Sequence, residues 1–193
     1  MTTAKRAPAQ PATIHQLKMT LSRIRPPIWR RIQVPSDITL VRLHQVIQVT
    51  MGWIDYHLHQ FEVGGLVYGD LSLNDDGWFD VLNERTARLA RVAPSAKSRL
   101  RYQYDFGDDW EHVILVEAVL PPAPGVRYPI CLKGKRACPP EDCGGPWGYA
   151  NLLEAIADPA HPEHSDLLGW LGKPFDPEAF DLEAINQRLA RFH

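Results

Sequence analysis

The sequence predicts an α+β fold with an antiparallel sheet of about five to seven strands, packed helices and a helical C-terminal portion. Two patterns support this prediction. Apolar and polar side chains alternate with a period of two along residues 14–22 and 99–120, as they do in half-buried strands. Beyond the proline-rich segment 121–129, apolar residues favour helices instead, at 148–158, 162–171 and 181–192.

Composition sets the class of protein. Of the 193 residues, 45% are hydrophobic and 23% are charged, which is typical of a soluble globular chain. This excludes a wholly disordered, fibrous or membrane-spanning protein, and no run approaches the roughly 18 apolar residues of a spanning helix. Residues 1–12 have no apolar core of a secretory signal, so we expect a disordered tail and a cytoplasmic protein. Residues 13–193 are expected to form one domain, mainly sheet with one helix up to 120 and a Cys/Pro/Gly loop with helices after it.

Breaking residues divide the first half of this domain into elements. Pro26 and Pro27 separate a strand at 14–22 from one at 28–34. Thr39 is placed to cap a helix that Gly52 ends. The remaining expected elements are a strand at 56–63, a turn at 64–65, its partner strand at 66–68, and an irregular segment at 71–97 with a short helix near 85–90.

Residues 99–120 form a predicted hairpin with a three-residue loop at 107–109. This register pairs Phe106 with Trp110 and Tyr104 with His112, so the two apolar faces coincide. It also sets Asp105 opposite Glu111, and two like charges in that position repel each other. An arginine, either from this face (Arg99, Arg101) or from elsewhere, a metal or solvent must compensate.

Positive charge is concentrated near the N-terminus. The chain has 21 Lys and Arg against 23 Asp and Glu, yet seven of the basic residues and none of the acidic ones lie within residues 1–36. The basic strands either lie against acidic segments of the same fold or bind an anionic partner. For a nucleic acid, the candidate binding residues are Arg23, Arg25, Arg30 and Arg31, with Trp29 among them to stack on a base.

Three further segments contain residues that can bind metals or transfer protons. On a strand, His57 and His59 would share one face and suit a metal or an acid–base pair; otherwise one is a buried core histidine. Residues 104–112 bring together Asp105, Asp108 and His112, which suit a divalent cation or the activation of water, unless the aspartates only form the turn. Thiols suitable for zinc occur at Cys131, Cys138 and Cys143, with His161 or His164 as a fourth ligand. No Cys-x-x-Cys spacing is present, and free structural cysteines are the alternative.

A stiff loop at 136–145 presents two neighbouring acids, Glu141 and Asp142, between a proline pair and a glycine pair. The loop precedes a predicted helix, whose N-terminal field favours carboxylates. These acids either belong to a functional site or hold the loop to Arg30, Arg31 or Arg136.

Four segments in order resemble the plasmid pRiA4b ORF-3-like family: PPIWRR (26–31), MGW with HLHQF (51–61), YDFGDDWEH (104–112) and ACPPEDCGGPWGY (137–149). The resemblance spans residues 14–189. It implies a compact α+β fold and an association with mobile DNA, since family members are also described as insertion-element passengers with a resolvase-like label. The chain lacks the catalytic-serine pattern of a serine resolvase, so recombination chemistry is not implied. The family motif is framed by Pro-Pro-Glu-Asp and Gly-Gly rather than by cysteines, which disfavours zinc.

Three hypotheses follow. The first is an accessory or interaction protein associated with mobile elements, which binds nucleic acid or another protein. The second is a metal-dependent hydrolase-like enzyme with a divalent cation, whose candidate catalytic residues are His59, Asp105, Asp108, His112, Glu141 and Asp142. The third is a module that binds a small ligand or peptide in an aromatic pocket of Trp53, Trp110 and Trp147.

Overall fold

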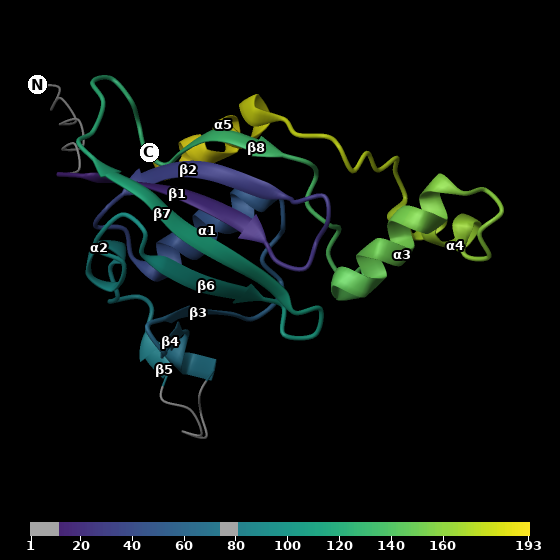
Figure 1. The fold of residues 1–193 in the computed structure, drawn as a ribbon, viewed down its shortest axis with the longest axis horizontal. Coiled ribbons are helices and arrows are strands. Elements are labelled where there is room, and N and C mark those ends of the chain that lie inside the picture. The colour runs from purple at the N-terminus through teal and green to yellow at the C-terminus, as the bar shows by residue number, and fades with distance from the viewer. Residues whose placement is uncertain (1–11, 74–80) are drawn as a thin grey trace, which may run out of the picture.

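A computed structural model describes residues 12–73 and 81–193, so the predicted tail at 1–12 lies outside the described residues apart from Ala12. Within them, eight strands form one sheet in the order β5-β4-β3-β6-β7-β1-β2-β8 (Figure 1). All neighbouring strands are antiparallel except β4 and β5. The strands are β1 (Ile14–Leu21), β2 (Trp29–Pro35), β3 (His59–Val63), β4 (Leu66–Gly69), β5 (Val81–Asn83), β6 (Arg99–Tyr104), β7 (Trp110–Leu120) and β8 (Ile130–Lys135). The α+β prediction is confirmed, but the sheet exceeds the expected five to seven strands.

The two unpredicted strands, β5 and β8, lie at opposite edges of the sheet. β5 has only three residues, too few for a visible alternation. β8 lies in the segment predicted as loop and helices, and its pairing with β2 shifts register between Arg31 and Ile32. It also contains Gly134, where an added Cβ would approach the Phe180 ring to 2.4 Å. The glycine therefore permits close packing within a strand, although in sequence it resembles a turn.

The helices within the described residues are α1 (Leu40–Met51), α2 (Leu89–Val92), α3 (Gly145–Ala157), α4 (His164–Leu171) and α5 (Leu182–Leu189), with 3-10 turns η1 (Leu71–Leu73) and η2 (Ala190–Phe192). α1 crosses behind the sheet, while α3 and α4 project to one side of it (Figure 1). α5 packs against β8 and α1. As predicted, Thr39 and Gly52 delimit α1, although the Thr39 side chain makes no capping hydrogen bond. No helix in these ranges is long and apolar enough to cross a membrane.

The β6–β7 hairpin differs from its predicted register by two residues. Tyr104 pairs with Trp110 and Tyr102 with His112, and residues 105–109 form the loop. The reason is that Asp105 leaves the strand with φ of 57°, where its Oδ1 accepts a hydrogen bond from the Gly107 N–H at 2.9 Å. A shift of two preserves the faces, so Tyr104 and Trp110 still lie in the core, whereas Phe106 is 48% exposed.

The predicted repulsion beside Glu111 is also relieved. Gln103, not Asp105, lies opposite Glu111. Arg101 on the same face donates hydrogen bonds to both Glu62 and Glu111, and this is one of the compensating arginines that the sequence suggested. Asp105 is thereby separated from the strand face and is free to point elsewhere.

Candidate metal centre

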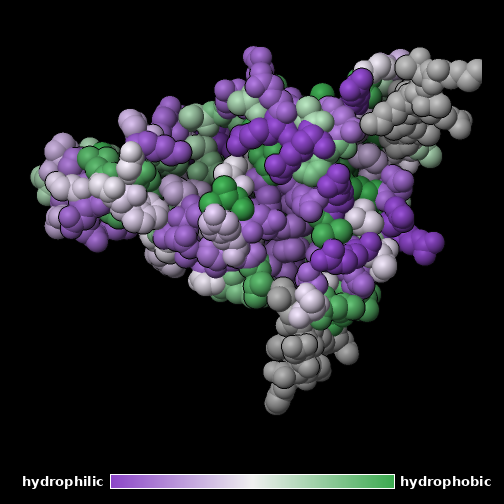
Figure 2. All heavy atoms as spheres, turned by 180° about the vertical axis from the view of Figure 1, so that it is seen from behind, coloured by the Kyte–Doolittle hydropathy of each residue, from purple (hydrophilic) through white to green (hydrophobic). Residues whose placement is uncertain are grey.

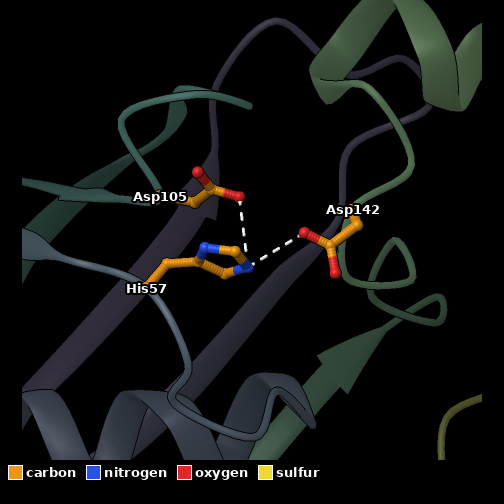
Figure 3. A group of neighbouring side chains, drawn as sticks. All are labelled: His57, Asp105 and Asp142. Atoms are coloured by element: carbon orange, nitrogen blue, oxygen red, sulfur yellow. Dashed lines mark ion pairs between the residues drawn. The ribbon is translucent and has the colours of Figure 1, made fainter.

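Three side chains from distant parts of the chain converge at one end of the sheet (Figure 3). His57 precedes β3, Asp105 follows β6, and Asp142 lies in the loop before α3. The His57 Nε2 is 3.0 Å from Asp142 Oδ1 and 3.6 Å from Asp105 Oδ2. One potential ligand atom from each residue lies within 4.8 Å of the other two. Glu141 adds a fourth group, with its Oε2 3.9 Å from the same nitrogen.

The His57 Nε2 is the unusual atom of this cluster. It is buried and makes no well-aligned hydrogen bond, although Asp142 Oδ1 stands 3.0 Å away and two further carboxylates lie near it. Two ligands on one divalent cation at bond lengths near 2.1 Å stand about 3.0–3.4 Å apart, depending on coordination geometry. The two distances from His57 Nε2, 3.0 Å to Asp142 and 3.6 Å to Asp105, are close to those between ligands of a single cation.

Two loops hold the acids in place. Asp142 has φ of 57° and follows the Pro139–Pro140 pair. The Gly144 N–H donates to Asp108 Oδ2 at 3.1 Å, which ties this loop to the hairpin loop at 105–109. An added Cβ at Gly145 would stand 2.3 Å from the Asp108 carbonyl oxygen. The two acidic segments singled out in the sequence therefore pack directly against each other.

Glu141 is oriented by two donors. Its Oε1 accepts a hydrogen bond from the Ile54 N–H at 2.8 Å, and the Tyr104 hydroxyl donates to its carboxylate at 3.1 Å. Burial and the nearby negative charge of Glu141 raise the pKa of Tyr104 well above its usual value, so this hydroxyl stays protonated. The arginine latch considered for the 141–142 loop is not what holds Glu141.

The predicted His57–His59 pair does not form. Because β3 begins only at His59, His57 belongs to the preceding bend, and the alternation of strand faces does not apply to it. His59 instead donates from Nε2 to the buried Glu84 at 2.8 Å and stacks on His44, with ring centres 3.4 Å apart. Neither His44 nor Glu84 stood in a recognisable motif. The only available signal in the sequence was that His44 follows Leu40 by four residues and so lies on the apolar face of the helix.

His112, predicted as catalytic, is a core residue. It is fully buried, and neither ring nitrogen has a hydrogen-bond partner. Burial lowers its pKa to about 4. Burial, followed by the neighbouring His59, lowers the pKa of His44 to about 3. Both rings are therefore neutral in the folded protein at pH 7 and lie outside the cluster around His57.

These neutral histidines predict acid sensitivity. In the unfolded chain a histidine takes up its proton near pH 6.5, whereas folded His112 does so only near pH 4. The unfolded state therefore binds more protons below pH 6.5, and stability falls as the pH is lowered, by about 1.4 kcal/mol per pH unit for one such histidine. We expect His112→Phe to give a shallower decline between pH 6.5 and 4, measured by urea unfolding at a series of pH values. Curves that stay parallel to those of the unchanged protein would contradict this assignment.

The three cysteines are not gathered with other potential metal ligands in the part of the chain that the structure describes. All three are free, and His57, Asp105 and Asp142 form the only ligand group found among residues 12–73 and 81–193. Burial raises the pKa of the Cys131 thiol to about 11 and that of Cys143 to about 12, and it raises that of Cys138 further. His164, considered as a fourth ligand, hydrogen-bonds the Ala155 carbonyl.

Three of the four candidate nucleic-acid-binding arginines have partners within the fold. Arg23 pairs with Asp109 at 2.7 Å, and Arg31 pairs with Glu117 at 2.6 Å. Arg30 is 2% exposed, whereas Arg25 is exposed. Much of the N-terminal positive charge is therefore neutralised or buried internally. Nucleic-acid binding and association with mobile DNA stay predictions.

The three tryptophans proposed for an aromatic pocket separate. Trp53 and Trp110 are buried with ring centres 6.0 Å apart, whereas Trp147 on α3 is 87% exposed. Trp53 alone of the three lines the cavities considered below. A single pocket enclosed by all three rings is therefore not present.

Comparisons with known proteins agree with this architecture. The chain is 40% identical over 181 residues to the uncharacterized protein y4hQ of Sinorhizobium fredii, covering 92% of this chain and 91% of that protein. It also resembles the crystal structure of MM3350, a protein of unknown function from Methanosarcina mazei Go1, with a TM-score of 0.81 and 41% identity over 90% of this chain and 98% of that one. The family model of plasmid pRiA4b ORF-3-like proteins matches residues 13–184. The chain therefore belongs to the plasmid pRiA4b ORF-3-like protein family.

Proposed function

We propose that the protein is a metal-dependent, hydrolase-like enzyme whose divalent cation is bound by His57, Asp105 and Asp142. The observation that supports this most strongly is the buried His57 Nε2, which stands among three carboxylates and makes no well-aligned hydrogen bond to any of them. A cation bound there would accept the nitrogen lone pair and offset the mutual repulsion of the acids. Without such a charge, several carboxylates close together disfavour one another's ionisation.

The donor set limits the kind of metal. One imidazole and two carboxylates suit borderline and hard divalent cations such as Zn²⁺ and Mn²⁺, and no thiolate is present to select a soft metal. Three protein ligands leave coordination positions for water, as in catalytic rather than structural sites. A cation lowers the pKa of bound water and so supplies a nucleophile at neutral pH.

Glu141 is the group placed to receive a proton from such a water. Its carboxylate stands beside the ligand set and is kept in one orientation by Tyr104 and the Ile54 N–H. We therefore assign Glu141 the role of general base.

Two cavities border the proposed centre, each beside one of its residues. One of about 280 Å³ is lined by His57 together with Glu84 and Arg85. Another of about 360 Å³ is lined by Glu141, Trp53 and Lys173. Both are near the lower end of the size range of small-molecule sites, which favours a small substrate or the end of a larger one.

Metal binding is tested first by titrating chelator-treated protein with Zn²⁺ and Mn²⁺ in a calorimeter. We expect saturable binding of one ion, weakened at least about 100-fold by Asp105→Asn or His57→Ala, because each removes a ligand. Asp109→Asn is the matched control, since Asp109 lies in the same loop but pairs with Arg23. Absence of saturable binding, or equal losses in Asp105→Asn and Asp109→Asn, would refute the centre.

The enzymatic role is tested separately with Glu141→Gln. This variant should retain the cation and lose hydrolysis of p-nitrophenyl esters of acetate and phosphate by about 100-fold, the contribution typical of a general base. A cation-loaded protein that hydrolyses none of these esters would favour a binding role for the centre. Unchanged activity in Glu141→Gln would show that Glu141 is not the general base.

A further inference from the structure

A larger cavity, of about 620 Å³, lies between α1, the loop at 52–55 and the C-terminal segment of α5 and η2. Its size falls within the range of small-molecule sites. Three arginines line it, namely Arg42, Arg188 and Arg191, together with apolar surface from Val49 and Trp53. This cavity does not include the residues of the proposed metal centre.

The arginines are held in position without acidic partners. The guanidinium carbons of Arg42 and Arg191 lie 4.8 and 4.9 Å from the centre of the Phe192 ring, a distance at which cation–π attraction holds both groups near the ring. Within the described residues, neither these two nor Arg188 forms an ion pair with a carboxylate. Arg42 and Arg191 share one ring without an ion pair and repel each other, so a bound anion would stabilise the arrangement.

One carboxylate, that of Asp55, also lines the cavity. The His44 Nε2 donates to Asp55 Oδ1 at 2.8 Å. By contrast, Gln48 is 3% exposed, lines the cavity and has a buried Oε1 without a hydrogen-bond partner. A buried acceptor without a donor is costly. The arginines call for a ligand that carries negative charge, and a hydroxyl group on that ligand would in addition offer the donor that Gln48 lacks.

We propose that this cavity binds a small organic phosphate monoester, with its phosphate on Arg42, Arg188 and Arg191 and its organic body against Trp53. Guanidinium groups match phosphate oxygens with paired hydrogen bonds. A doubly charged monoester compensates three arginines better than a single carboxylate does. The apolar wall beside the arginines gives a reason for an organic ester rather than the inorganic ion.

The test is calorimetric titration of the full chain with four probes in the presence of EDTA, which excludes phosphate binding through a metal. The probes are phenyl phosphate, inorganic phosphate, phenol and succinate. We expect phenyl phosphate to bind most tightly. The double variant Arg42→Gln/Arg191→Gln should weaken its binding at least about tenfold, whereas Arg99→Gln, an exposed arginine on β6, should leave it unchanged.

Each contrary outcome has a definite meaning. If phenol binds as tightly as phenyl phosphate, the arginines do not form an anion site and the proposal is wrong. Tighter binding of succinate would overturn the assignment to phosphate. Equal losses in the double variant and in Arg99→Gln would show that binding depends on net charge rather than on this cavity.

Discussion

Replacing Arg30 with alanine is expected to lower the free energy of unfolding by about 3 kcal/mol, a large effect for one substitution at a position that the sequence marks as basic and polar. The side chain is 2% exposed and pairs with no carboxylate of residues 12–73 and 81–193. It donates instead to three carbonyl oxygens, those of Trp29, Thr50 and Lys135, at 2.9, 3.1 and 2.9 Å. Burial lowers its pKa, which shows the cost of placing this charge inside the fold.

The three carbonyls explain why the charge is retained despite that cost. Thr50 lies in the last turn of α1, where carbonyl oxygens have no partner within the helix. A cation there also interacts favourably with the negative end of the helix dipole. Trp29 and Lys135 belong to β2 and β8. The guanidinium also lies over the Phe180 ring, at 4.9 Å. One side chain thus joins α1, two strands and the segment before α5.

Two further variants distinguish the internal hydrogen bonds of Arg30 from the mere loss of a positive charge. Arg25→Ala removes an exposed arginine and should change stability by less than about 0.5 kcal/mol. Arg31→Met breaks the pair with Glu117, which is partly exposed, and should cost about 1 kcal/mol or less. Urea unfolding of the three variants gives the comparison. Equal effects of Arg30→Ala and Arg25→Ala would contradict the internal role of Arg30 and restore it as a candidate for binding phosphate.

Local signals in the sequence predicted much of the fold. Gly52 ends α1 as predicted, and the helix predicted at 181–192 begins as α5 after Asp181, whose side chain caps it by accepting the Ala184 N–H. The strand at 14–22 is likewise confirmed as β1. The edge strands were missed because their evidence is not local. β8 is recognisable only through its pairing with β2 and the packing of Phe180 on Gly134.

The candidate site was predicted in its parts but not in its assembly. Glu141 and Asp142 were identified as two neighbouring acids in a stiff loop, and Asp105 as part of a segment that gathers several acids and a histidine. The sequence pairs His57 with His59, which is not its neighbour in the site, because the bend at His57 has the residue pattern of a strand. Contacts between loops, such as the hydrogen bond from Gly144 to Asp108, decide which of these residues meet. The spacing of residues in a single sequence does not predict such contacts.

The second large effect on stability is expected at Gly148, where alanine should destabilise the protein although it normally stabilises a helix relative to glycine. Within a helix, alanine is favoured over glycine by about 1 kcal/mol. In α3, however, a Cβ on Gly148 would stand 1.9 Å from the carbonyl oxygen of Cys143. That oxygen belongs to the backbone directly after Asp142, so it can move only if the loop of the metal centre moves with it. We expect Gly148→Ala to cost about 3 kcal/mol of stability.

Gly169 is the matched control, since it lies in α4 and an added Cβ there would meet nothing within 4 Å. Gly169→Ala should therefore stabilise the protein by up to about 1 kcal/mol, so the two substitutions differ in sign. Thermal unfolding measures both, and cation titration of Gly148→Ala should show weaker binding, because the clash displaces Asp142. A loss of stability with unchanged cation affinity would separate the loop packing from the proposed centre. A stabilised Gly148→Ala would show that the approach of Cys143 to the helix is looser than the structure describes.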